Sequence, residues 1–203
     1  MTGGIPSELL EMLERNPDMA DFVAGYPKAD RKKVGSFSRD EIDADHPLLL
    51  QWDKRWGYYP YGESIIAVSG CGPVCLSMVI LGVRHEAVLP SKISKFSERE
   101  KYYVKGSGTS WRLMTEGAAH FGLNGSEISL SEQSMRSVLD SSGMIICAMG
   151  PGDFTTEGHF IVIYGYDEEG FRVNDPNSRQ RSETSWNFDQ LRPQIKNLWG
   201  YTG

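Results

Sequence analysis

The sequence predicts an α+β fold, in which helices precede a set of antiparallel strands. Segments with helical length and spacing occupy the chain as far as about residue 140, and short apolar segments bounded by turn residues follow them. The turn sequence Asp167-Glu168-Glu169-Gly170 separates two of these apolar segments and indicates a hairpin. Helices and antiparallel strands that occupy different parts of one chain are typical of the α+β class.

The composition indicates a folded protein that does not bind nucleic acid. Of 203 residues, 39% are hydrophobic and 24% charged, which excludes a disordered chain and a coiled coil. The 21 Lys and Arg residues against 27 Asp and Glu residues give a net charge of −6, so binding of DNA or RNA phosphates is not expected. No apolar segment approaches the roughly 18 residues of a membrane span, and no secretion signal is recognised.

The first part of the chain differs from the rest. Residues 1–45 are expected to form an N-terminal helical arm and linker, and residues 46–203 a single domain. Apolar spacing predicts two short helices within residues 1–26, the first capped by Ser7. Charged residues and turn formers dominate Pro27–Pro47, which indicates a linker. Helices this short are marginal alone, so we expect them to pack on the domain.

Within the domain, the pattern predicts four helices followed by three strands. The helices are Gly72–Gly82, Pro90–Arg99, a segment capped by Thr109 that runs through His120, and a segment capped by Ser131 that runs through Leu139. The strands are Met144–Met149, Phe160–Tyr166 and Phe171–Asn174.

Cys71 is a candidate nucleophile. It lies between Gly70 and Gly72 at the start of a predicted helix, where free amide groups and the helix dipole stabilise a thiolate. The two glycines permit a tight turn that leaves the sulfur accessible. The alternative interpretation is that Cys71 is a small apolar residue at a helix start.

The other two cysteines are expected to be structural. Cys75 lies one helical turn after Cys71, and the C-x3-C spacing is unlike that of zinc sites. Cys147 lies within an apolar strand, which is typical of a core residue. The sequence therefore predicts no metal site and no cofactor.

His159 and Asp175 are candidates for a general base and the carboxylate that orients it. His159 opens an apolar strand, which would hold it rigidly at the edge of a cleft. If Phe160–Tyr166 and Phe171–Asn174 pair around their turn, residue numbers that sum to about 337 lie opposite each other, which brings Asp175 near His159. A structural histidine and an aspartate that caps a turn are the alternatives. Surface or capping roles suffice for the three remaining histidines, His46, His85 and His120.

Three further residues could complete such a site. An acyl-transfer cysteine needs an oxyanion hole, for which the backbone N–H at the helix start and the side-chain amide of Gln51 are candidate donors. Trp111 follows the loop Gly106–Gly108, and Phe154 lies in the loop before His159, so each could line a substrate subsite. The alternatives are a surface position for Gln51 and core positions for both aromatic residues.

The order Gln51, Cys71, His159, Asp175 resembles that of papain-like cysteine peptidases. The strings GCGPVCLSM, GHFIVIYGYD and VNDPNS are more closely similar to the bacterial C-thirty-nine-like group, which is related to the bacteriocin leader-processing peptidases. The resemblance extends from about residue 48 to residue 201.

This resemblance implies a papain-like fold and a cysteine peptidase that acts on a peptide or protein substrate. It implies that Cys71 is the nucleophile, His159 the base, Asp175 the orienting residue and Gln51 the oxyanion donor. It also favours an extracellular or cell-surface location, with a cytoplasmic location as the alternative. Leader peptidases are fused to membrane transporters and no such segment is found here, so leader peptides are not the expected substrate. Transglutaminase-like or amidase acyl transfer, and a binding module without activity, are the alternative functions.

Overall fold

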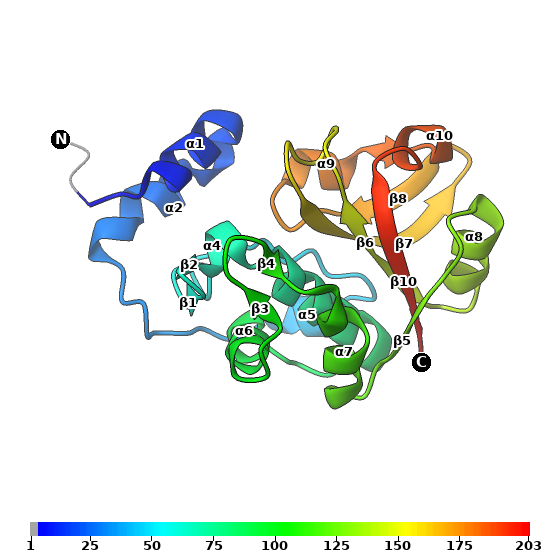
Figure 1. Ribbon diagram of the computed structural model, residues 1–203, viewed down its shortest axis with the longest axis horizontal. Helices are drawn as coiled ribbons and strands as arrows, with labels where there is room; N and C mark the ends of the chain where they lie inside the picture. The colour runs from blue at the N-terminus through cyan, green and yellow to red at the C-terminus, as the bar shows by residue number, and fades with distance from the viewer. Residues whose placement is uncertain (1–3) are drawn as a thin grey trace.

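The computed structural model describes residues 4–203 and is organised around one six-stranded antiparallel sheet (Figure 1). Residues 1–3, which belong to the expected N-terminal arm, lie outside the described part. The strand order is β5-β10-β6-β7-β8-β9. The strands are β5 (Asn124–Glu127), β6 (Met144–Met149), β7 (His159–Asp167), β8 (Gly170–Asn174), β9 (Ser185–Trp186) and β10 (Ile195–Thr202). Two small hairpins, β1 (Pro60–Tyr61) with β2 (Ser64–Ile65) and β3 (Tyr103–Val104) with β4 (Gly108–Thr109), lie outside this sheet.

Strand β6 shows why a continuous apolar segment forms the centre of the sheet. Successive side chains of a strand point to opposite faces. Ile146 and Ala148 belong to the core cluster that contains helix α5 (Cys71–Arg84), whereas Ile145 and Cys147 pack in a second cluster with Met135 of α8 (Glu132–Asp140). Both faces of the strand are therefore buried, and every residue of β6 is apolar.

The chain has further helices besides α5 and α8. They are α1 (Ser7–Arg15), α2 (Ala20–Gly25), α3 (Arg39–Asp43), α4 (Ile66–Ser69), α6 (Pro90–Arg99), α7 (Glu116–His120), α9 (Arg179–Glu183) and α10 (Phe188–Leu191). Within residues 4–203, none of the helices combines the length and hydropathy needed to cross a bilayer.

The α+β class is confirmed, and several predicted elements have the predicted bounds. Helix α6 and strand β6 coincide with their predictions, and the Ser131 hydroxyl caps α8 by accepting from the Ser134 backbone N–H. The central helix begins at Cys71 and continues to Arg84, where His85 adopts a left-handed conformation (φ 54°) and ends it.

Two predicted caps are wrong. Pro6, whose extended backbone suits the position, is the cap of α1, and Ser7 is the first helical residue. Thr109 lies in β4, where its hydroxyl hydrogen-bonds to the buried Tyr61 hydroxyl at 2.8 Å. Ser110 instead caps a short 3₁₀ helix, and α7 begins only at Glu116.

The N-terminal helices pack on the domain, as expected for elements of their length. Leu9, Met19 and Phe22 are buried in one cluster with Leu50 and Trp52 of the domain. The expected linker contains α3, which Ser38 and Glu41 stabilise by a reciprocal capping box. The division of the chain near residue 45 stays a prediction.

Candidate active site

Cys71 is the first residue of α5, and the residue as a whole is partly exposed. The flanking glycines are explained by close packing. A Cβ atom on Gly70 would lie 2.6 Å from the Ile66 carbonyl oxygen, and one on Gly72 would lie 2.9 Å from the Thr109 side chain. Neither glycine has a positive φ, so close approach of α4 and β4 to the helix start, rather than a left-handed turn, requires them.

The hairpin β7–β8 brings His159 and Asp175 together. Asp167 pairs with Gly170 and Gly165 with Arg172, which gives the predicted sum of 337, and a bulge at Tyr164 lowers later sums by one. The His159 Nε2 and Asp175 Oδ1 atoms lie 2.7 Å apart. Both side chains are almost fully buried, at 8% and 0% exposed. Strand pairing therefore places the imidazole beside the carboxylate.

The thiol and the imidazole have opposite pKa shifts. Burial raises the pKa of Cys71, but the hydrogen bond with His159, the charge of that residue, and the N–H groups of Phe160 and Gly72 lower it below its usual value overall. Burial lowers the pKa of His159, but Asp175 and Cys71 outweigh this effect and raise it to about 10. These directions favour a thiolate–imidazolium pair at neutral pH. Because Nε2 contacts Asp175, Nδ1 is the nitrogen left for the sulfur.

Arg181 is a site residue that the sequence reasoning missed. Its Nε lies 2.6 Å from Asp175 Oδ2, and the Asn177 backbone N–H donates to Oδ1 at 2.8 Å. Burial raises the pKa of Asp175, but the positive charges of His159 and Arg181 and their hydrogen bonds lower it by more. The pKa is therefore below its usual value, and the carboxylate stays ionised. The Trp186 indole donates to the Arg181 carbonyl and holds α9 in place. A lone arginine six residues after an aspartate has no distinctive pattern, so only the fold reveals it.

Gln51 lies in a turn at the same site and is 3% exposed. Its Nε2 donates to the Ala67 carbonyl at 2.6 Å, and its backbone N–H donates to the Pro176 carbonyl at 2.7 Å. The side-chain amide has two N–H groups, so one donor remains for another acceptor. Gln51 and Cys71 line the same cavity.

Replacement of Gln51 by alanine is expected to lower kcat by about 10²–10³ if this amide donates to a reaction oxyanion. Gln51→Glu keeps the side-chain size but exchanges the donor for an acceptor, so we expect a loss at least as large. Steady-state kinetics measure both effects, and thermal melting identifies variants that have lost their fold. Unchanged kcat in a folded Gln51→Ala variant would exclude Gln51 from the oxyanion hole.

Two cavities meet at Cys71 and His159. The first, of about 480 Å³, includes Gln51 and Phe154, and the second, of about 750 Å³, includes Trp111. Trp111 is 47% exposed, with its ring edge on Trp199. Phe154 is 4% exposed and packs on Trp186 with ring centroids 4.5 Å apart. Both border the cleft, and Trp111 has the larger surface to offer a substrate.

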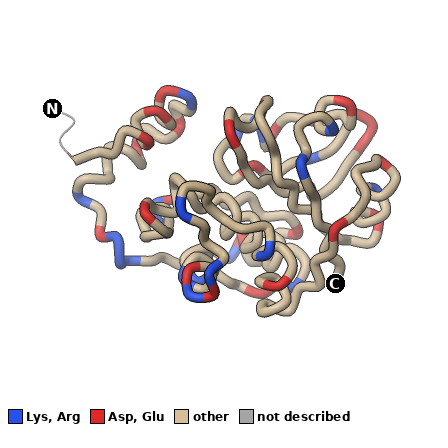
Figure 2. Tube along the Cα trace, viewed as in Figure 1, with Lys and Arg blue, Asp and Glu red and all other residues tan. Residues whose placement is uncertain are grey.

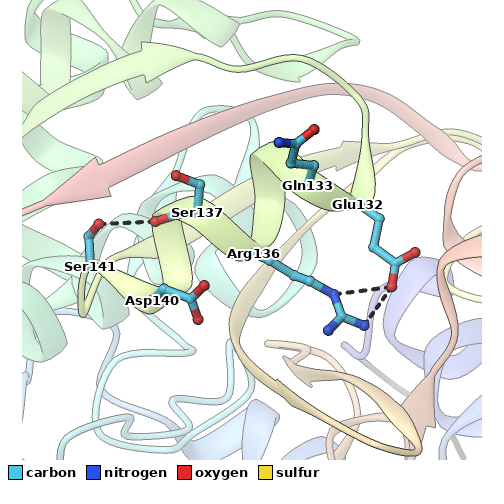
Figure 3. A pocket seen from close by; sticks show the side chains of 6 residues that line it. All are labelled: Glu132, Gln133, Arg136, Ser137, Asp140 and Ser141. Carbon is cyan, nitrogen blue, oxygen red and sulfur yellow. Dashed lines mark hydrogen bonds and ion pairs between the residues drawn. The ribbon is translucent and has the colours of Figure 1, made fainter.

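A separate hollow lies over α8 (Figure 3). Its charged side chains are partnered within the protein: Arg136 pairs with Glu132 at 2.6 Å, and Asp140 accepts from the Tyr166 hydroxyl at 2.7 Å. It contains none of the candidate site residues.

The other two cysteines are fully buried and differ from Cys71 in their protonation. Burial raises the pKa of Cys75 well above its usual value and also raises that of Cys147. Cys75 belongs to the cluster around α5, and Cys147 lies in the cluster on the opposite face of the sheet. These buried positions agree with the interpretation of Cys75 and Cys147 as core residues without a chemical role.

Comparison with known proteins gives one family and several related structures. The model of the Peptidase_C39 like family matches residues 44–203. The peptidase domain of Streptococcus ComA, a bi-functional ABC transporter involved in a quorum sensing pathway, is 17% identical, with a TM-score of 0.54 over 76% of this chain and 96% of that one. A Bacillus anthracis protein assigned to the C39-like peptidases is 15% identical, with a TM-score of 0.47 over 78% of this chain and 94% of that one. No curated protein matches. The fold is that of the papain-like C39 peptidase domains.

Proposed function

Since the chain belongs to the Peptidase_C39 like family, we propose that it is a cysteine peptidase in which Cys71 is the nucleophile, His159 the general base and acid, and Asp175 the residue that orients the imidazole. The observation that carries this proposal is the 2.7 Å contact between His159 and Asp175 at a cavity that Cys71 and His159 both line, together with the lowered thiol pKa and the raised imidazole pKa. A peptide or protein is the substrate that the family suggests.

The arrangement can perform both halves of amide hydrolysis. The Cys71 thiolate attacks the peptide carbonyl, and the Gln51 amide together with the Cys71 backbone N–H stabilises the oxyanion. The His159 imidazolium gives its proton to the leaving amine, and a thioester remains. His159 then takes a proton from water, and the hydroxide attacks the thioester. The thiolate and the imidazolium form again, and the carboxylic acid product leaves and loses its proton to solvent.

Selective alkylation at pH 6 tests the activated thiol. Iodoacetamide is expected to label Cys71 in the native protein, because the thiolate persists below the usual pKa of a cysteine. Cys75 and Cys147 are expected to stay unlabelled, because both are buried and have raised pKa values. Peptide mapping by mass spectrometry measures all three rates in one sample.

The same protein is then incubated with casein and with a peptide library, and new termini are identified by mass spectrometry. Labelling of Cys71 no faster than that of Cys75 or Cys147 would contradict the activated thiolate. Rapid labelling of Cys71 without cleavage of any peptide would support the activated thiolate but contradict the proposed peptidase function.

A further inference from the structure

The N-terminal helix α1 is a wall of the active-site cleft. Glu8, Glu11 and Arg15 line the 480 Å³ cavity that also contains Cys71 and His159. Glu8 also borders the 750 Å³ cavity on the other side of the catalytic pair. The match to the family model begins at residue 44, so α1 lies outside the matched residues.

This wall is anchored to the loop that carries the candidate catalytic carboxylate. The Asn16 side chain at the end of α1 donates to the Asn177 carbonyl at 2.7 Å, two residues after Asp175. The Tyr58 hydroxyl donates to the Phe22 carbonyl of α2 at 2.7 Å, and Leu9 of α1 is fully buried. The cavity-facing residues of α1 are thus held at fixed positions relative to the site.

The opposite wall is the loop between β6 and β7, which faces α1 across the cleft (Figure 1). It contributes Asp153 and Glu157 to the same cavity, and Glu157 borders both cavities. Figure 2 shows the acidic residues that recur along α1. Carboxylates therefore line both walls.

The charges of this cavity do not cancel. Among residues 4–203, Glu8, Glu11 and Glu157 form no ion pair. Of the two arginines that line the cavity, Arg181 is already paired with Asp175, which leaves Arg15 as the opposing charge.

A second, independent feature points to a ligand here. Gln51, 3% exposed, lines the same cavity, and its Oε1 has no hydrogen-bond partner among the described residues. A buried acceptor without a partner needs an explanation, and a hydrogen-bond donor of a bound substrate would provide one.

We propose that this acidic side of the cleft selects peptides that carry lysine or arginine next to the bond to be cleaved. The inference rests on the proposed peptidase function, because it assigns the substrate of the same site. Carboxylates on two facing walls lower the electrostatic potential between them, which attracts a cation and repels an anion.

Charged thiol reagents test the potential at Cys71 without any assay of activity. The thiolate attacks the sulfenyl sulfur of a methanethiosulfonate, a disulfide forms, and methanesulfinate leaves. In the wild-type protein, the trimethylammonium-ethyl reagent is expected to react faster than the sulfonato-ethyl reagent. The triple variant Glu8→Gln, Glu11→Gln, Glu157→Gln is expected to lower this rate ratio by about tenfold at low ionic strength and much less in about 0.5 M salt.

Glu14→Gln is the matched control, because Glu14 lies on α1, is exposed and does not line the cavity. Its rate ratio should equal that of the wild type. A wild-type ratio that the triple variant does not change would overturn the inference and leave the peptidase proposal intact.

Matched peptides that carry lysine, alanine or glutamate at each position around the cleaved bond test the specificity itself. The wild type should prefer lysine over alanine in kcat/KM by about tenfold at one position, and the triple variant should lose this preference but still cleave the alanine peptide. Equal cleavage of all three peptides would reject the specificity, whereas cleavage of none would reject the peptidase function.

Discussion

Replacement of Cys71 by alanine is expected to lower kcat for peptide hydrolysis by at least about 10⁴-fold, because no other described thiol borders the cleft. The fold should be retained, because alanine suits the first position of α5 and the side chain it replaces is small and partly exposed. Cleavage kinetics and a thermal melting curve measure these two properties.

Cys147→Ala is the matched control for this experiment. Cys147 lies on the face of the sheet opposite α5, so we expect normal cleavage and a lower melting temperature from the small cavity that forms. Residual cleavage by a folded Cys71→Ala protein at more than a few per cent of the wild-type rate would exclude Cys71 as the nucleophile.

Replacement of Asp175 by asparagine is expected to lower kcat by about 10³–10⁴. The carboxylate is a principal reason that the pKa of His159 is raised to about 10, so its loss should lower the pKa of the imidazole. A neutral imidazole stabilises the thiolate less, and the pKa of Cys71 should consequently rise. The rate of Cys71 alkylation against pH measures this change as a shift of the midpoint to higher pH.

The Arg181→Gln variant removes the ion pair that holds Asp175 in place but keeps the negative charge of Asp175. It leaves the carboxylate beside His159, so we expect a smaller loss of about tenfold in kcat and little movement of the alkylation midpoint, with Arg181→Lys closer to the wild type. An Asp175→Asn protein that keeps both the wild-type kcat and the wild-type midpoint would remove Asp175 from the site.

The approach of His159 to Asp175 could be predicted because it depends on a local hairpin. A four-residue turn defines the register of β7 and β8, and a bulge of one residue does not change which end of the sheet the two side chains share. The bounds of α6 and β6 could be predicted for a similar reason, since Pro90 and the apolar run of β6 act within their own segments.

Strand β10 could not be predicted in the same way. Apolar and polar residues do not alternate along its sequence, which is Ile-Lys-Asn-Leu-Trp-Gly-Tyr-Thr. A bulge near Lys196 interrupts the strand pairing, and both faces of the strand are partly covered. Its neighbours, β6 and β5, lie about 50 and 70 positions earlier in the chain, so no local turn indicates the pairing.

The sequence by itself determined the α+β class, the cysteine at a helix start and the pairing of a histidine with an aspartate, since these depend on periodicity, capping and one tight turn. Only the tertiary structure decided that Arg181 supports Asp175, that Gln51 is buried beside Cys71 and that α1 forms a wall of the cleft. Arg181 lies only six residues after Asp175, but the turn between them has no pattern that predicts their contact. The other two contacts are created by burial between elements that no local sequence signal connects.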